Sequence, residues 1–105
     1  MLGQDDLGGM DRNEIQDVVR EQDKNVIDSV RLVFQDGSSN KFYEIGIEEH
    51  DGAAGERVCD VPFRFGKIGA SGQTGYKARN ENLDTARKAF DKAVAEKIKK
   101  GYIKE

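Results

Sequence analysis

Two neighbouring stretches of the chain alternate apolar and polar residues with a period of two. The first begins at residue 29, and its apolar side carries Val30, Leu32 and Phe34. The second runs from Phe42 to Glu49. Positions 36–40 between them are Asp, Gly, Ser, Ser and Asn, which favour tight turns. A period of two is typical of half-buried strands, so we predict an antiparallel hairpin.

A third strand is predicted from about Arg57 to Phe65, after a loop at residues 50–56 that has no apolar period. Pro62 interrupts this strand, and a proline has no amide hydrogen to donate to a sheet. We therefore expect the strand at a sheet edge or with a bulge at this point. Glycines at positions 66, 69, 72 and 75 predict a tight loop, followed by a short strand at about Tyr76–Arg79.

Residues 82–100 have the apolar spacing of an amphipathic helix. Asn82 is a favourable N-cap, and Gly101 ends the pattern after a lysine-rich last turn. The apolar stripe consists of Leu83, Ala86, Phe90, Ala93, Val94 and Ile98. An antiparallel sheet of about four strands, with this long C-terminal helix packed on one face, would bury both apolar surfaces. We therefore predict an α+β fold.

Residues 1–28 differ from the rest of the chain. Residues 1–10 are rich in glycine and aspartate and predict a mobile segment. Residues 11–24 place Ile15, Val18 and Val19 on one helical stripe among acidic residues. We expect residues 1–28 to form a flexible acidic arm with a short, loosely attached helix, and residues 29–105 to form the folded domain.

The composition narrows the class of protein. A chain of 105 residues has room for one core. No stretch approaches the roughly 18 apolar residues that span a bilayer, and the N-terminus has no signal-peptide pattern. The single cysteine, Cys59, cannot form an internal disulfide. We expect a cytoplasmic protein that does not contact membranes.

The residues that carry catalysis or bind metals elsewhere are sparse in this chain. His50, the single histidine, lies in an acidic loop and is separated from Cys59 in the sequence. The sequence therefore indicates neither a catalytic Cys–His pair nor a metal cluster. The glycine-rich loop lacks the Gly-Lys-Ser/Thr ending of a P-loop and leads into a strand instead of a helix. We therefore predict a non-catalytic binding module without a metal or cofactor.

The charge is divided unevenly along the chain. Residues 1–60 have 6 Lys and Arg against 15 Asp and Glu, whereas residues 61–105 have 11 against 5. The basic half would attract an anionic partner, or the two halves would only neutralise each other. Cations and aromatic residues alternate in its strands, and such mixtures bind phosphates and bases. Phe65, however, shares its strand face with Val61 and Phe63, and on alternation alone it belongs to the core.

Four segments in this order resemble the WGR domain family. They are residues 40–45 (NKFYEI), 63–69 (FRFGKIG), 72–73 (GQ) and 96–102 (EKIKKGY), and the resemblance covers about residues 29–103. It implies an antiparallel sheet with one packed helix, and a role in nucleic-acid binding. The charge pattern and the resemblance together predict a nucleic-acid-binding surface made by Arg64, Phe65, Gly66, Lys67, Gln73, Lys77 and Arg79.

The sequence departs from the family signature at two positions. Phe65 replaces the tryptophan or tyrosine of the family, and Lys67 replaces its arginine. Lysine lacks the bidentate fork of arginine, so generic attraction to the phosphates of DNA or RNA is expected in place of recognition of a DNA end. The alternative is a protein-interaction module, in which a sheet edge or the acidic arm docks on another protein. The pattern leaves the oligomeric state open.

Overall fold

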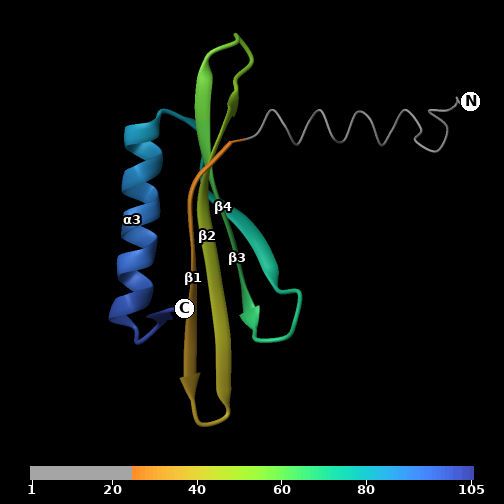
Figure 1. Ribbon diagram of the computed structural model, residues 1–105, viewed down its shortest axis with the longest axis vertical. Helices are drawn as coiled ribbons and strands as arrows, with labels where there is room; N and C mark the ends of the chain where they lie inside the picture. The colour runs from red at the N-terminus through yellow and green to blue at the C-terminus, as the bar shows by residue number, and fades with distance from the viewer. Residues whose placement is uncertain (1–24) are drawn as a thin grey trace, which may run out of the picture.

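The computed structural model of the protein describes residues 25–105 and shows a five-stranded antiparallel sheet with one helix (Figure 1). The elements in chain order are β1 (Asn25–Asp36), β2 (Ser39–Asp51), β3 (Arg57–Lys67), β4 (Gln73–Glu81), α3 (Leu83–Lys99) and β5 (Ile103–Lys104). The strands lie in the order β4-β3-β2-β1-β5. The predicted α+β fold is confirmed, with five strands instead of about four, because the chain after α3 returns to pair with β1.

The hairpin of β1 and β2 has the predicted alternation. Leu32 is paired with Tyr43 and Val30 with Ile45, and these side chains all point toward the helix. The pairing shifts register between Val26 and Asp28, which interrupts the period of two. The regular alternation of the sequence therefore predicts a strand only from residue 29, whereas β1 begins four residues earlier. Residues 25–28 therefore belong to the sheet, and the rest of the predicted arm lies outside the described residues.

Strand β3 lies inside the sheet, between β2 and β4. Of the two arrangements expected around Pro62, the edge position is wrong and the bulge is confirmed, because the pairing with β4 shifts between Cys59 and Val61 and again between Val61 and Pro62. The bulge lets an interior strand accept a residue without an amide hydrogen. Strand β4 is the edge strand, and it is longer than the predicted segment of residues 76–79.

The helix α3 is formed as predicted. The side chain of Asn82 accepts a hydrogen bond of 2.8 Å from the amide of Thr85, which satisfies one of the free N–H groups of the first turn. The buried residues of the stripe are Ala86, Phe90, Ala93 and Val94, and they pack on the apolar residues of the sheet. Leu83 and Ile98, at the two ends of the predicted stripe, are exposed.

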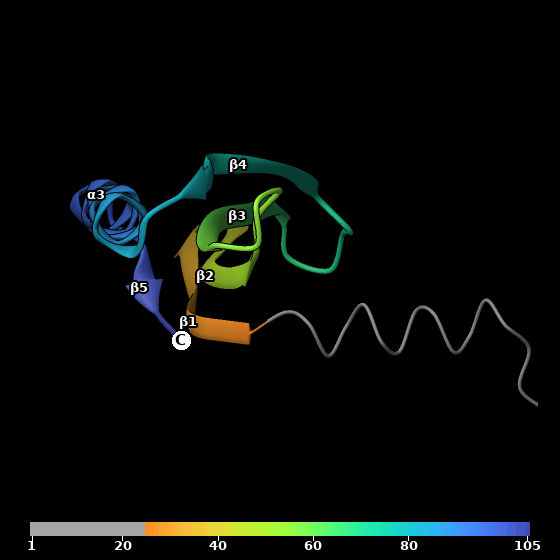
Figure 2. The same ribbon diagram turned by 90° about the horizontal axis from the view of Figure 1, so that it is seen from above.

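The helix covers one face of the sheet, which we call the helix face (Figure 2). No other helix or strand of residues 25–105 covers the opposite face, which we call the open face. A helix of 17 residues is about 25 Å long, whereas β2 with 13 residues extends about 43 Å. The turn between β1 and β2 consequently projects past the C-terminal end of α3 (Figure 1). Part of the helix face is therefore left uncovered.

His50, predicted in a loop, lies in β2, which runs on to Asp51. Its Nε2 atom lies 3.1 Å from Oδ2 of Asp60. The backbone carbonyl of Asp51 and the carboxylate of Asp60 raise the pKa of His50.

Residues 25–105 contain no group of three or more His, Cys, Asp or Glu side chains arranged to hold a metal ion. None of their helices is long and apolar enough to cross a membrane.

Candidate nucleic-acid interface

The pleat of the sheet separates the predicted binding residues onto two faces. Tyr43, which packs in the core under α3, is paired with Phe65, and Phe65 is paired with Gln73. Residues that pair directly across strands share a face, and neighbours along a strand alternate. The helix face therefore carries Phe65, Lys67, Gln73 and Lys77, whereas the open face carries Arg64, Gly66 and Arg79.

Three aromatic rings form a row across the helix face. The ring centroids of Tyr43 and Phe63 are 5.8 Å apart, and those of Phe63 and Phe65 are 6.0 Å apart. Tyr43 is buried, Phe63 is half-buried and Phe65 is 39% exposed, so the row runs from the core to solvent. Alternation predicted Phe65 in the core. Its side chain does lie on the helix face, as predicted, but it is not buried. Phe65 lies two residues before the end of β3.

Five lysines surround this aromatic row, and we call them the lysine cluster. They are Lys41, Lys67, Lys77, Lys97 and Lys100. The ammonium groups of Lys77 and Lys97 lie over the rings of Phe63 and Tyr43, at 5.0 and 4.8 Å from the centroids. None of the five forms an ion pair with a carboxylate of the described chain. Their charges are therefore available to an external anion.

The pKa of Lys97 shows that these charges act on one another. Burial lowers the pKa of its ammonium group, and the positive charges of Lys100, Lys77 and Lys41 lower it further. Glu96 acts in the opposite direction. A bound anion would relieve this mutual repulsion, because it would place negative charge among the cations.

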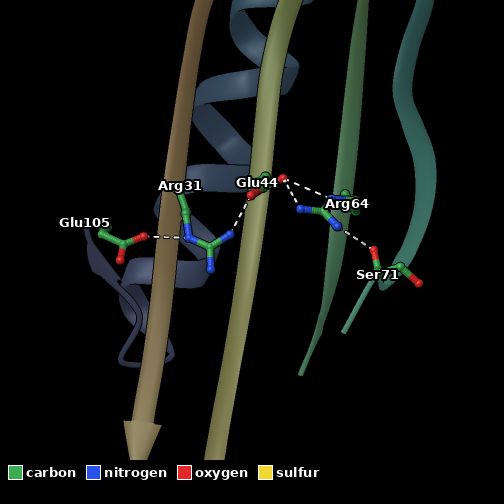
Figure 3. A network of polar contacts seen from close by, with 5 residues as sticks. All are labelled: Arg31, Glu44, Arg64, Ser71 and Glu105. Atoms are coloured by element: carbon green, nitrogen blue, oxygen red, sulfur yellow. Dashed lines mark hydrogen bonds and ion pairs between the residues drawn. The ribbon is translucent and has the colours of Figure 1, made fainter. Parts of the chain in front are cut away.

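The open face carries arginines, and two of them form ion pairs with carboxylates of the protein. Arg31 donates to Glu44 at 2.5 Å and to Glu105 at 2.5 Å, and Arg64 donates to Glu44 at 3.0 Å and to the carbonyl of Ser71 at 2.6 Å (Figure 3). Burial opposes the ionisation of Glu44, but the hydrogen bonds from the two guanidinium groups outweigh it and hold the pKa of this carboxyl below its ordinary value. Arg64 is thus tied to Glu44 and to the glycine-rich loop.

The two guanidinium groups also cover a buried ring. The carbon atoms of the Arg31 and Arg64 guanidinium groups lie 4.8 and 4.7 Å from the centroid of Phe42, which is almost fully buried. Gly72 lies against the same ring with a φ of 78°, and a Cβ atom there would lie 2.5 Å from the carbonyl oxygen of Phe65. The loop therefore needs glycine at this position in order to fold back onto the sheet.

A groove of about 740 Å³ crosses the strands of the open face. The floor of the groove is formed by small or compact residues of β1, β2 and β3, namely Ser29, Gly46 and Pro62. Arg31, Glu44 and Arg64 line one side. Tyr76, which is 51% exposed and lies under the guanidinium group of Arg79, closes the β4 end.

The model of one protein family, described as the WGR domain, matches residues 28–105. The chain belongs to the WGR family. The match covers all but three of the residues that the structure describes, so the WGR domain is the whole sheet with its helix. No curated protein and no solved structure gives a match. The predicted resemblance is confirmed at the level of the family.

Sequence reasoning missed part of the helix face of this WGR domain. It selected basic residues from one continuous stretch, residues 64–79, and left out Lys41, Lys97 and Lys100. Lys41 could have been found, because it precedes Tyr43 by two residues and therefore shares its side of the strand. Lys97, in the last turn of α3, and Lys100, its C-cap, had no local signal, because lysines at the C-terminal end are common in any helix.

Proposed function

We propose that this WGR domain binds nucleic acid on the helix face, without catalysis. The observation that carries the proposal is the lysine cluster, whose five ammonium groups have no carboxylate partner in the described chain and surround an exposed ring. Lysines attract the phosphate backbone, and Phe65 offers a surface for a base or a sugar. Membership of the WGR family supports the same function.

Because the free cations of the helix face are lysines and not arginines, we can infer how binding depends on salt and on sequence. Lysine is a point charge and does not fix a phosphate by two parallel hydrogen bonds, as arginine does. The arginines best suited to that geometry, Arg31 and Arg64, already donate to Glu44. We therefore expect binding that depends strongly on salt and weakly on sequence.

The test is a titration of the full chain with single-stranded DNA, blunt duplex DNA and single-stranded RNA at two salt concentrations, followed by backbone amide chemical shifts. The expected result is salt-sensitive shifts at Lys41, at Phe65 to Lys67, at Lys77 and around Lys97. Shifts confined to the open face would place the site elsewhere. The absence of shifts for all three ligands at low salt would refute nucleic-acid binding.

A second candidate is a protein-interaction module, and the groove of the open face favours it. An open sheet face with an exposed tyrosine at one end and compact residues in its middle resembles the centre of protein interfaces, where aromatic residues are enriched. The two candidates use opposite faces of the sheet. Shifts at Ser29, Gly46 and Tyr76 on addition of a protein partner, with no effect of DNA on them, would distinguish the second function from the first.

A further inference from the structure

His50 has an acceptor oxygen beside each of its two ring nitrogens. Nδ1 lies 2.9 Å from the backbone carbonyl oxygen of Asp51. Nε2 is buried and lies 3.1 Å from Oδ2 of Asp60, close enough for an ion pair, although the ring is not aligned for a straight hydrogen bond. A neutral imidazole has one N–H group and one lone pair, so either neutral tautomer would point a lone pair at one of the two oxygens. The geometry therefore fits the imidazolium, which has an N–H group on both nitrogens.

Asp60 connects this ion pair to the start of the helix. It is the one buried charged residue of the described chain, and its Oδ1 atom accepts a hydrogen bond of 2.8 Å from the backbone amide of Asn80. Asn80 lies where the pairing of β3 with β4 shifts, and its φ of 54° is uncommon for a residue other than glycine. Two residues later, Asn82 caps α3. The two oxygens of Asp60 thus join β2 to the segment that leads into the helix.

The neighbouring charges favour a positively charged His50. They come from β2, β3 and β4, and they are Glu48, Glu49, Asp51, Arg57, Asp60 and Arg79. Glu48 is paired with Asp60 across β2 and β3, and two carboxylates in this arrangement repel each other unless a cation lies beside them. Arg57 opposes the charging of His50, but it already forms ion pairs with Glu49 and Asp51. The raised pKa of His50 agrees with this arrangement.

We propose that His50 and Asp60 form a pH-dependent latch between the sheet and the start of α3. The latch is closed while His50 is charged. When His50 loses its proton, Asp60 loses its cation, and the hydrogen bond that the same carboxylate accepts from Asn80 weakens. Because the pKa of His50 is raised above its ordinary value of 6.5, the stability that the latch adds is complete below that value and is lost as the pH rises through the folded pKa. The latch does not depend on the proposed nucleic-acid binding.

The first test is a pH titration of the full chain, from about pH 5.5 to about pH 8.5, followed by NMR. His50 is the single histidine, so its ring gives the one imidazole signal of the protein. We expect a midpoint above 6.5 for this signal and the same midpoint for the amide shift of Asn80. Protection of that amide from hydrogen exchange, corrected for the intrinsic rate, should fall at least about twofold on the alkaline side. A midpoint at or below 6.5, or an Asn80 amide that does not follow it, would overturn the proposal.

Matched variants separate the ion pair from a general effect of charge. Asp60→Asn keeps the size of the side chain and an oxygen for Asn80, and it should lower the midpoint of His50. Glu81→Gln removes the same charge from the residue after Asn80. Glu81, however, is paired with the buried Cys59 and so lies on the face opposite Asp60, and its loss should leave the midpoint nearly unchanged. Equal shifts in the two variants, or no shift with Asp60→Asn, would overturn the pairing of His50 with Asp60.

The contribution to stability is tested with His50→Gln, which cannot become charged. Burial raises the pKa of the Cys59 thiol above its ordinary value of 9.0, so that group stays neutral in both proteins over this range. Urea denaturation gives the ratio of the unfolding equilibrium constants of the variant and the wild type. This ratio should be at least about twofold larger at pH 6 than at pH 8.5, in the range that partly exposed ion pairs contribute. A ratio that does not change with pH would show that the latch adds no stability and would overturn it.

Discussion

The two faces of the sheet hold basic side chains with different partners. On the open face Arg31 and Arg64 share Glu44, and Arg31 also pairs with Glu105, so two carboxylates balance the two guanidinium charges. On the helix face the lysine cluster has no carboxylate partner in the described part of the chain. A count of basic residues along the sequence does not distinguish these cases. The availability of a cation depends on what it contacts, and this difference can be tested directly.

The largest effect is expected from removal of lysine charges on the helix face. The triple substitution Lys41→Gln, Lys67→Gln and Lys77→Gln should weaken DNA binding about 100-fold at low salt, at roughly 1 kcal/mol for each lost phosphate contact. The slope of log affinity against log salt should become shallower by about 2 to 3. Fluorescence anisotropy over a series of salt concentrations measures both quantities.

The matched control removes the same charge from another part of the surface. Substitution of Lys88, Lys92 and Lys104 by glutamine changes the net charge equally but leaves the lysine cluster unchanged. Its effect on affinity should be much smaller. Equal losses in the two triple variants would mean that only net charge matters, and the lysine cluster would not be the binding site.

The exposed aromatic residues of the two faces give the second prediction. Phe65→Ala should lower the affinity for single-stranded DNA by about tenfold, within the range of 1 to 3 kcal/mol found for base stacking on aromatic side chains. Tyr76→Ala, on the open face, should change it by less than about twofold, because nothing places that ring beside the lysine cluster. Intrinsic fluorescence or anisotropy titration measures both variants. A larger loss from Tyr76→Ala would reverse the assignment of the faces.

Much of the fold could be predicted because its signals are local. The alternation of Leu32 and Phe34 and the cap at Asn82 each depend on a few neighbouring residues, and both appear in the structure as expected. The interior position of β3 could not be predicted, because it depends on pairing with β4. That strand begins with Gln73 and has little apolar alternation. Pro62 allowed both an edge and a bulge, and only the distant partner decides between them.

The candidate site was harder to predict for a related reason. Arg64 and Lys67 are three residues apart in the sequence and therefore appeared to belong to one basic surface. An odd separation along a strand places two side chains on opposite faces. The carboxylate that balances Arg64 is Glu44, which lies 20 residues away in the sequence. Neither the neutralisation of Arg64 nor the approach of Lys97 from the helix has a signal in the local sequence.

The third prediction concerns the stability that the open face gains from Glu44. Glu44→Gln keeps the shape of the side chain and removes its charge, and it should lower the free energy of unfolding by about 0.5 to 1 kcal/mol near neutral pH, because the pair is partly exposed and screened. The pKa of Glu44 is lowered in the folded protein from its ordinary value of 4.5. The contribution is therefore complete above that value and is lost as the pH falls through the folded pKa.

Urea denaturation of the wild type and of Glu44→Gln at a series of pH values measures this difference. The two curves should be parallel above about pH 5.5 and converge as the pH falls through the folded pKa of Glu44, because below it the carboxyl is protonated in both the folded and the unfolded state. Asp28 also has a lowered pKa, through its hydrogen bond with Arg87, but it contributes to both proteins and cancels in the comparison. A difference in stability that persists at low pH would show that packing, and not charge, is lost in the variant.

The smallest effect is expected from Arg64, although it lies next to Phe65 in the sequence. Arg64→Gln should change the affinity for DNA by less than about twofold, because its guanidinium group already donates to Glu44 and Ser71 on the face opposite the lysine cluster. Lys77→Gln removes the same charge on the helix face and should cost about fivefold, so the pair of single variants compares the faces at equal change in charge. Parallel anisotropy titrations at low salt decide between the outcomes. If Arg64→Gln were the more damaging of the two, the ion pair with Glu44 would have to open on binding, and the open face would take part in the interface.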